Sequence, residues 1–156
     1  MHISNQSAGI LLYRNINKLL ELFIVHPGGP FFKNKDAGAW SIPKGEFMPD
    51  EDPLLAAKRE FEEETGQPVT GDNLIKLSPV KLKSGKTIHA WAVEGDIDAG
   101  KIVSNFFEME WPPKSGKQAS FAEIDRGGWF GVDEAKLKLN PAQAPLVDEL
   151  VTILNP

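Results

Sequence analysis

The sequence predicts a sandwich of the α/β or α+β type, in which a sheet packs against helices. Two segments, at about 53–65 and about 144–154, carry the start and stop signals of helices. Several apolar runs with β-branched residues lie between turn residues and are typical of strands. Strands mixed with two clear helices bury their apolar faces as packed layers. A chain of 156 residues is long enough to build one such core without disulfides.

The first strands are expected at Ser7–Tyr13 and Leu19–His26, which form a hairpin. Asn15 and Asn17 mark the turn between them. The segment Pro27–Ala39 is rich in glycine and proline, so it predicts a loop, and this loop carries two neighbouring phenylalanines.

The central helix is expected at Pro53–Thr65. Asp52 is suited to the N-cap, Pro53 to the first helical position and Gly66 to the position after the C-cap. A second, amphipathic helix is expected at Ala144–Leu154. The remaining strands are predicted at Ile75–Leu82, Thr87–Val93, Ser104–Trp111 and Trp129–Val132.

Composition excludes several classes of protein. Hydrophobic residues make up 41% and charged residues 25% of the chain, as in ordinary globular proteins rather than disordered ones. A net charge of −5 argues against binding to a nucleic acid polymer or a membrane by bulk electrostatics. There are no cysteines, which excludes disulfides, thiolate zinc sites and a cysteine nucleophile. The N-terminal residues lack the features of a signal peptide, and no apolar run reaches the length of a membrane span, so we expect a cytoplasmic protein.

Four acidic residues lie in the last turns of the central helix, where they oppose the helix dipole. On a helical wheel Glu60, Glu63 and Glu64 fall within an arc of roughly 100°, whereas Glu62 faces solvent. Phe61 belongs to a separate apolar stripe. Carboxylate oxygens are the ligands that Mg²⁺ prefers, so a bound divalent cation would compensate the clustered charge.

The spacing around these acids is more specific than an acidic helix face. The residues Gly45, Glu51, Arg59, Glu60, Glu63, Glu64 and Gly66 fit the pattern G-x5-E-x7-R-E-U-x-E-E-x-G-U, where U is apolar. The chain therefore resembles the Nudix hydrolases, from the strands before this box to the final helix. The last U position holds Gln67, and we expect Val69 to supply the missing apolar contact.

The resemblance implies a single Nudix domain over residues 1–156, folded as an α/β/α sandwich with a mixed central sheet. It implies a pyrophosphohydrolase that uses Mg²⁺ or Mn²⁺ to cleave a nucleoside diphosphate linked to another moiety. The implied metal ligands are Glu60, Glu63, Glu64 and the carbonyl of Gly45. The implied catalytic residues are Glu60 and Glu63, with Arg59 and Glu51 orienting the glutamates, and the general base is left open.

The residues before the box bear on the substrate. The run Trp40 to Gly45 is similar to the W-x-x-P-K-G sequence of dinucleoside-polyphosphate hydrolases, in which Lys44 would contact phosphate. Lys117, in the expected loop between Trp111 and Phe121, would reach more distant phosphates. Aromatic side chains can stack on a base, and we name Phe32 and Trp40 as substrate contacts. An additional acidic or amide group is expected from Glu108, Glu110, Gln118 or Glu123.

Two alternatives remain beside a hydrolase of nucleoside or dinucleoside polyphosphates. One is a MutT-like enzyme that hydrolyses unwanted nucleoside triphosphates. The other is a Nudix-like module that binds a nucleotide without hydrolysis, although such modules usually lose box glutamates. A small-molecule nucleotide is the expected partner, and the sequence is equally consistent with a monomer and a homodimer.

Overall fold

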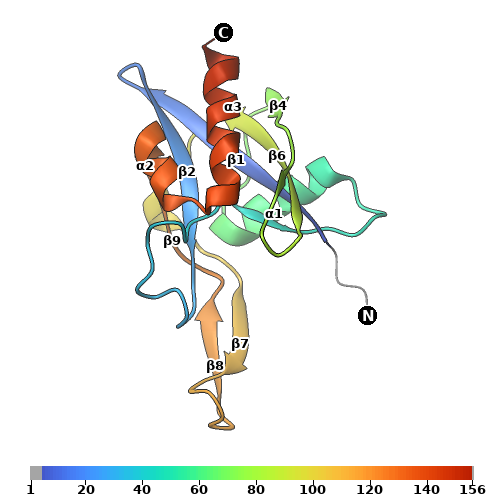
Figure 1. Cartoon of the computed structure of the whole chain (residues 1–156), viewed down its shortest axis with the longest axis vertical. Helices are drawn as coiled ribbons and strands as arrows, with labels where there is room; N and C mark the ends of the chain where they lie inside the picture. Colours follow the sequence, from blue (N-terminus) through green and yellow to red (C-terminus); the bar gives the residue numbers. More distant parts are fainter. Residues whose placement is uncertain (1–4, 156) are drawn as a thin grey trace.

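A mixed sheet forms the centre of the computed structural model, which describes residues 5–155 (Figure 1). The strands follow the order β4-β6-β1-β2-β9, with β3 paired to β1 and β5 paired to β6. Strands β1 and β6 run parallel, whereas β1 pairs antiparallel with β2 and β3. The strands are β1 (Gln6–Ile16), β2 (Leu19–Pro27), β3 (Lys44–Glu46), β4 (Leu74–Lys76), β5 (Val80–Lys81), β6 (Thr87–Glu94) and β9 (Ile124–Gly131). The predicted α/β class with a mixed sheet is confirmed.

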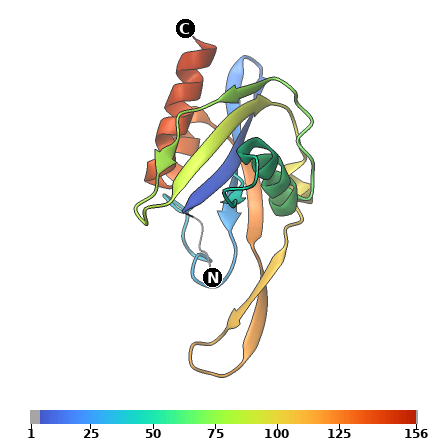
Figure 2. The ribbon, with the colours of Figure 1, turned by 90° about the vertical axis from the view of Figure 1, so that its right-hand side faces the viewer.

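Helices cover both faces of this sheet (Figure 2). Helix α1 (Pro53–Thr65) packs through Phe61 and two alanines onto a core layer that contains Phe23 of β2. Helices α2 (Val132–Lys138) and α3 (Ala144–Leu154) pack on the opposite layer, which contains Trp40. Two short 3₁₀ helices, η1 (Ala99–Lys101) and η2 (Pro141–Gln143), complete the body. In the described part of the chain, no helix has both the length and the apolar character to cross a membrane.

The bounds of α1 agree with the prediction because the end signals act as expected. The Asp52 side chain accepts a hydrogen bond from the Leu54 amide, and the helix ends at Gly66 with a φ of 76°. That left-handed conformation strains most other residues. The four glutamates are therefore fixed in their helical register by signals at both ends.

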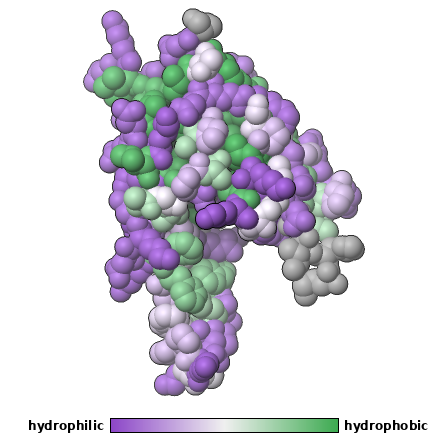
Figure 3. Space-filling model, in the orientation of Figure 1, coloured by the Kyte–Doolittle hydropathy of each residue, from purple (hydrophilic) through white to green (hydrophobic). Residues whose placement is uncertain are grey.

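A two-stranded ribbon, β7 (Phe106–Glu110) with β8 (Gln118–Ala122), projects away from the body (Figures 1 and 2). Trp111, the residue after β7, meets Phe31 of the loop between β2 and β3 edge to face, with ring centroids 5.7 Å apart. A hydrophobic patch lies at the upper part of the ribbon, whereas hydrophobic and hydrophilic residues alternate over the body above it (Figure 3). The ribbon is thus braced by one loop rather than by the core.

Two expectations about the segments after Trp111 were wrong. The segment after Trp111, expected as a loop, contains β8, because Ala119 and Phe121 alternate and pair with β7. The strand expected at 129–132 begins earlier, at Ile124, and Val132 starts α2 instead. Helix α2 carries acids in its first turn and lysines in its last, which complements the helix dipole.

The strand expected at Ile75–Leu82 is divided into β4 and β5. Between them, the amide and hydroxyl of Ser78 donate to the two carboxylate oxygens of Glu149 on α3, at 2.7 and 2.9 Å. A side chain of the C-terminal helix therefore takes a backbone hydrogen bond that a continuous strand would have made within the sheet.

Candidate active site

The turn before α1 brings Gly45 into contact with the helix. Strand β3 pairs with β1 so that Gly45 lies opposite Ala8, at the edge where α1 packs. A Cβ atom placed on Gly45 would lie 2.1 Å from both Cδ and Oε2 of Glu60. Any other residue here would push the Glu60 carboxylate away, so the observed contact requires glycine. The Gly45 backbone and the Glu60 carboxylate therefore form one compact unit.

Arg59 ties the loop before the helix to two of the glutamates. Its Nη2 lies 3.0 Å from Glu51, and its Nη1 lies 2.9 Å from Glu60 and 3.4 Å from Glu63. Glu51 in turn accepts a hydrogen bond from the amide of Met48 at 3.1 Å. The structure thus gives Arg59 and Glu51 contacts suited to the orienting role expected of them.

Lys44 and Glu64 form a half-buried pair beside this network. The Lys44 amide donates to Glu64 Oε1 at 3.2 Å. Burial raises the pKa of Glu64 to about 8, an effect that the charge of Lys44 opposes. Burial likewise lowers the pKa of Lys44, and the nearby charge of Lys86 lowers it further.

Glu60 has a similar environment. Its side chain is 14% exposed, against 39% for Glu63. Burial first, and then the charge of Glu63, raise the pKa of Glu60, whereas Arg59 lowers it. The box thus holds crowded carboxylates that are partly shielded from water.

Two further charged residues approach this site from outside the box. Lys86, just before β6, forms an ion pair with Glu46, the residue after Gly45. The charge of Glu123, between β8 and β9, raises the pKa of both Glu60 and Glu64. Sequence reasoning missed Lys86, because its proximity depends on β3 and β6 lying on either side of the start of β1.

The structure also distinguishes the four candidates for an additional acidic or amide group at the site, which are Glu108, Glu110, Gln118 and Glu123. Glu110 accepts hydrogen bonds from the amides of Lys114 and Gly116, at 2.8 and 3.2 Å, and so closes the turn of the ribbon. Glu108 and Gln118 lie exposed along the ribbon. Among these residues, only Glu123 affects the pKa of the box glutamates.

Backbone hydrogen bonds hold Glu123 in place. Its amide donates to the carbonyl of Asn105 at 2.8 Å, and the Asn105 amide donates to the carbonyl of Glu63 at 3.2 Å. The carbonyl of Glu123 accepts a hydrogen bond from the Gly28 amide at 2.8 Å. Glu123 is therefore linked to the box helix through Asn105, by two successive hydrogen bonds.

The other expected substrate contacts lie elsewhere. Trp40 is 3% exposed in the core layer under α3, and its Nε1 donates to Asp36 at 2.6 Å. Phe32 lies half exposed in the loop between β2 and β3, and Lys117 lies at the turn of the ribbon. Within residues 5–155 none of the three contacts a box residue through a hydrogen bond, ion pair or ring contact. Their substrate contacts stay predictions.

The chemistry of the box suits a hard divalent cation, although no three acidic or histidine side chains among residues 5–155 converge into a preformed cage. Two carboxylates are engaged by Arg59 instead. The raised pKa values of Glu60 and Glu64 reflect partly desolvated, neighbouring carboxylates, and a cation would relieve this unfavourable state. The expected donors Glu60, Glu63, Glu64 and the Gly45 carbonyl are all oxygen ligands that fit Mg²⁺ or Mn²⁺.

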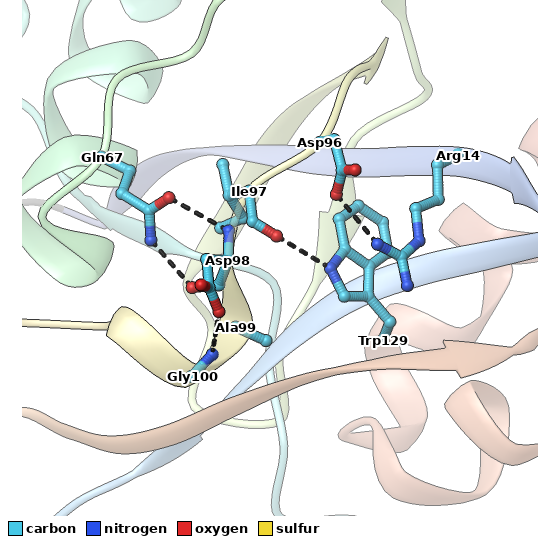
Figure 4. A pocket seen from close by; sticks show the side chains of 8 residues that line it. All are labelled: Arg14, Gln67, Asp96, Ile97, Asp98, Ala99, Gly100 and Trp129. Atoms are coloured by element: carbon cyan, nitrogen blue, oxygen red, sulfur yellow. Dashed lines mark hydrogen bonds and ion pairs between the residues drawn. The ribbon is translucent and has the colours of Figure 1, made fainter.

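The departure at Gln67 has a structural explanation (Figure 4). Gln67 Nε2 donates to the carbonyl of Asp98 at 3.0 Å, and its Oε1 accepts from the Asp98 amide at 3.2 Å. This pairing ties the end of the box to the segment before η1. Val69 packs against the core layer under α1, as expected from the sequence. The adjoining cavity, of about 700 Å³, is bordered by Arg14 stacked on Trp129 at 4.1 Å.

The fold and the box together define a protein of the Nudix class. The sequence profile of the NUDIX domain matches residues 4–150, so the chain belongs to the Nudix family. This membership, with the box complete at its charged positions, supports a pyrophosphohydrolase. Among curated proteins, none matches the chain significantly.

Solved structures of other Nudix proteins have the same fold. An Ap4A hydrolase from C. elegans, solved as a binary complex, superposes with a TM-score of 0.66 at 19% identity, over 95% of this chain and 97% of that one. The NUDIX domain of NrtR from Shewanella oneidensis, crystallised with ADP ribose, gives a TM-score of 0.64 at 16% identity, over 99% and 91% of the two chains. A MutT structure from a study of Aliivibrio salmonicida and Vibrio cholerae gives 0.56 at 19% identity, over 94% and 95%.

Proposed function

We propose that this chain is a divalent-cation-dependent hydrolase that cleaves a phosphoanhydride bond in a nucleoside or dinucleoside polyphosphate. The observation that carries the proposal is the contact of Glu60 with Gly45, beside the Arg59 network and the Lys44–Glu64 pair. Every charged position of the Nudix box is present; Arg59 pairs with Glu51, Glu60 and Glu63, and Glu64 accepts a hydrogen bond from the Lys44 amide. We propose that residues 1–156 form a single Nudix domain that carries this activity, in line with the family match over residues 4–150.

The chain supplies the cation ligands and the charges around the phosphates. Glu60, Glu63, Glu64 and the Gly45 carbonyl would hold Mg²⁺ or Mn²⁺. When bound, the cation neutralises phosphate oxygens and makes water a better nucleophile at neutral pH. Arg59 keeps the glutamates oriented through its ion pairs.

Two lysines and one acid then act on the substrate. Lys44 and Lys86 place positive charge beside the box, where it would stabilise a polyphosphate. Glu123 carries a carboxylate into the same electrostatic environment, and we assign it as the base or as an additional ligand. Its backbone link to Glu63 would preserve that position during turnover.

For the substrate, we favour dinucleoside polyphosphates over nucleoside triphosphates. The Trp40 to Gly45 sequence supports this choice, as does the second lysine near Lys44, because a longer phosphate chain carries more charge to neutralise. The similarity to an Ap4A hydrolase structure is compatible with it. The MutT-like reaction is the second candidate.

A substrate panel with and without divalent cation tests the proposal. We expect Mg²⁺ or Mn²⁺ to be required and dinucleoside polyphosphates to be cleaved fastest, with products resolved by chromatography. Preferential release of pyrophosphate from oxidised nucleoside triphosphates would instead favour the MutT-like reaction. No cleavage of any substrate, together with metal-independent nucleotide binding, would favour a binding module and contradict the proposal.

Matched glutamine variants test the assignment of the glutamates. Glu63→Gln and Glu64→Gln should each reduce turnover by several orders of magnitude without unfolding the chain. Glu62→Gln, on the exposed face of the same helix, should retain turnover close to the original value. Equal losses in all three variants would show that the substitutions act through the helix rather than the cation site.

A further inference from the structure

A second cavity lies on the other side of the sheet from the box helix. We call it the loop cavity; its volume is about 520 Å³, and it opens between the β2–β3 loop, β9 and α2. Its inner wall is formed by Trp40 and Phe130, which belong to the core layer of α2 and α3. Helix α1 packs on the opposite layer. The loop cavity is therefore distinct from the carboxylate site.

Positive charge is concentrated around this cavity, although the chain as a whole has a net charge of −5. Four of the residues that line it are cationic, and one is acidic. The acid, Asp36, is already neutralised: both of its carboxylate oxygens accept from Lys138 Nζ at 3.0 Å, and it also accepts from Trp40. The remaining cations are Lys33, Lys35 and Arg126.

These three cations have few acceptors in the protein. Within residues 5–155 Lys33 makes no hydrogen bond or ion pair. In the same range, the one contact of Lys35 Nζ is with the ring of Phe32, whose centroid lies 5.5 Å away. The nearest carboxylate to Arg126 is that of Asp125, at 3.6 Å, and Asp125 already pairs with the buried His26 at 2.9 Å. An anion with several acceptor oxygens would satisfy donors that the protein leaves largely unpaired.

The aromatic wall strengthens this preference. The Arg126 guanidinium lies 5.3 Å from the Trp40 ring centroid, and Lys138 lies 5.2 Å from the same ring. The rings hold the two cations along a surface of low polarity, where electrostatic attraction exceeds that in open water. A guanidinium donates to phosphate in a bidentate manner, and lysines add point charges.

We propose that the loop cavity is an anion site that binds the phosphate group of a small phosphorylated molecule. The ligand is either free inorganic phosphate or a phosphate ester such as a nucleotide, since both present the same oxygens. This proposal does not depend on the hydrolase activity, because none of the box residues takes part.

Titration of the metal-stripped chain, with no chelator or cation added, tests the proposal. We suggest following the Trp40 indole N–H by NMR at constant ionic strength, because that group donates to Asp36 at the cavity wall. Phosphate, pyrophosphate and AMP should each shift the signal saturably if the phosphate group is recognised. Saturation by AMP alone would identify a phosphate ester as the ligand, and saturation by the inorganic anions alone would identify free phosphate.

Phosphate binding should be compared between variants inside and outside the loop cavity. The double variant Lys33→Gln, Arg126→Gln should weaken binding at least about 10-fold, since it removes two charge-assisted contacts. Lys101→Gln, a side chain 81% exposed on η1 and outside the cavity, should leave binding unchanged, as should Glu63→Gln in the box. An equal shift produced by chloride, no saturable shift, or unchanged binding in the double variant would overturn the proposal.

Discussion

A single methyl group added at Gly45 should disable the site. In Gly45→Ala the new Cβ would lie 2.1 Å from Cδ and Oε2 of Glu60 and 2.5 Å from Oε1. The collision can be relieved only if the carboxylate leaves its contact with Arg59, or if β3 moves away from α1. The backbone φ of Gly45 is not in the left-handed region, so any effect arises from this collision.

The size of the effect follows from the two ways of relieving the collision. Overpacking costs about 1–3 kcal/mol, and the low end applies here because the atoms in the way are the far end of the flexible Glu60 side chain, so the Tm should fall by about 2–4 °C. Displacement of a ligand glutamate by about 1 Å should reduce turnover about 100-fold or more. Both quantities can be measured, by thermal unfolding and by initial rates with saturating cation.

Two further variants separate the collision from a general effect of alanine. Gly131→Ala adds a methyl group where no atom lies within 4 Å, so turnover should be unchanged; because Gly131 is the N-cap of α2, the Tm should change only slightly. In Gly45→Ala, Glu60→Asp the shorter acid withdraws from the methyl group, so most of the lost Tm should return although turnover stays low. A Gly45→Ala variant with the original Tm and turnover would refute the contact between Gly45 and Glu60.

Three other predictions follow from contacts outside that pair. Gln67→Ala removes both hydrogen bonds to the Asp98 backbone and should cost about 1 kcal/mol of unfolding free energy with turnover unchanged; a large loss of turnover would contradict a purely structural role. Gln143→Ala leaves the buried amide of Ile42 without its acceptor at 2.9 Å and should cost about 1–3 kcal/mol, measured by urea unfolding, whereas no loss would show that water replaces the side chain. Without metal, the pKa of Glu64 is about 8 in the folded chain, against the ordinary 4.5. The folded chain therefore keeps a proton on Glu64 that the unfolded chain loses above about pH 4.5. The free energy of unfolding should therefore fall as the pH rises from about 4.5 to about 8. Glu64→Gln should remove that part of the pH dependence between pH 5 and 8, and identical slopes in both proteins would refute the raised pKa.

The parts of the fold that sequence could predict are those with local signals. Asp52 and Gly66 determine the ends of α1 through contacts within a few residues, and the box glutamates follow from helical geometry. The split between β4 and β5 was not predictable in this way, because Ser78 is held by Glu149 from a distant helix. Strand β8 was missed because its pairing partner lies beyond a turn rich in lysine, glycine and proline.

The residues of the candidate site also differ in whether a local sequence pattern predicts them. The contacts of Arg59 with Glu51 and Glu63 fit the spacing of the box. Lys86 comes to the site through strand order, which leaves no local pattern in the sequence. Glu123 was one of four candidates that the sequence named, but the sequence could not choose among them, because the choice depends on the connection between β8 and β9. For Trp40 the local pattern suggested a substrate contact, but the structure places this side chain in the core.

The projecting ribbon offers a place where the chain can change length at little cost. Its two strands leave the body at Asn105 and return at Glu123, and these two residues are bonded to each other and to the body. Residues inserted at the turn, near Gly116, would therefore lengthen the ribbon without displacing the acid at its base. A fluorescent label or affinity tag could be carried there, and relatives with longer or shorter ribbons could vary in what they contact while the same carboxylates stay in register.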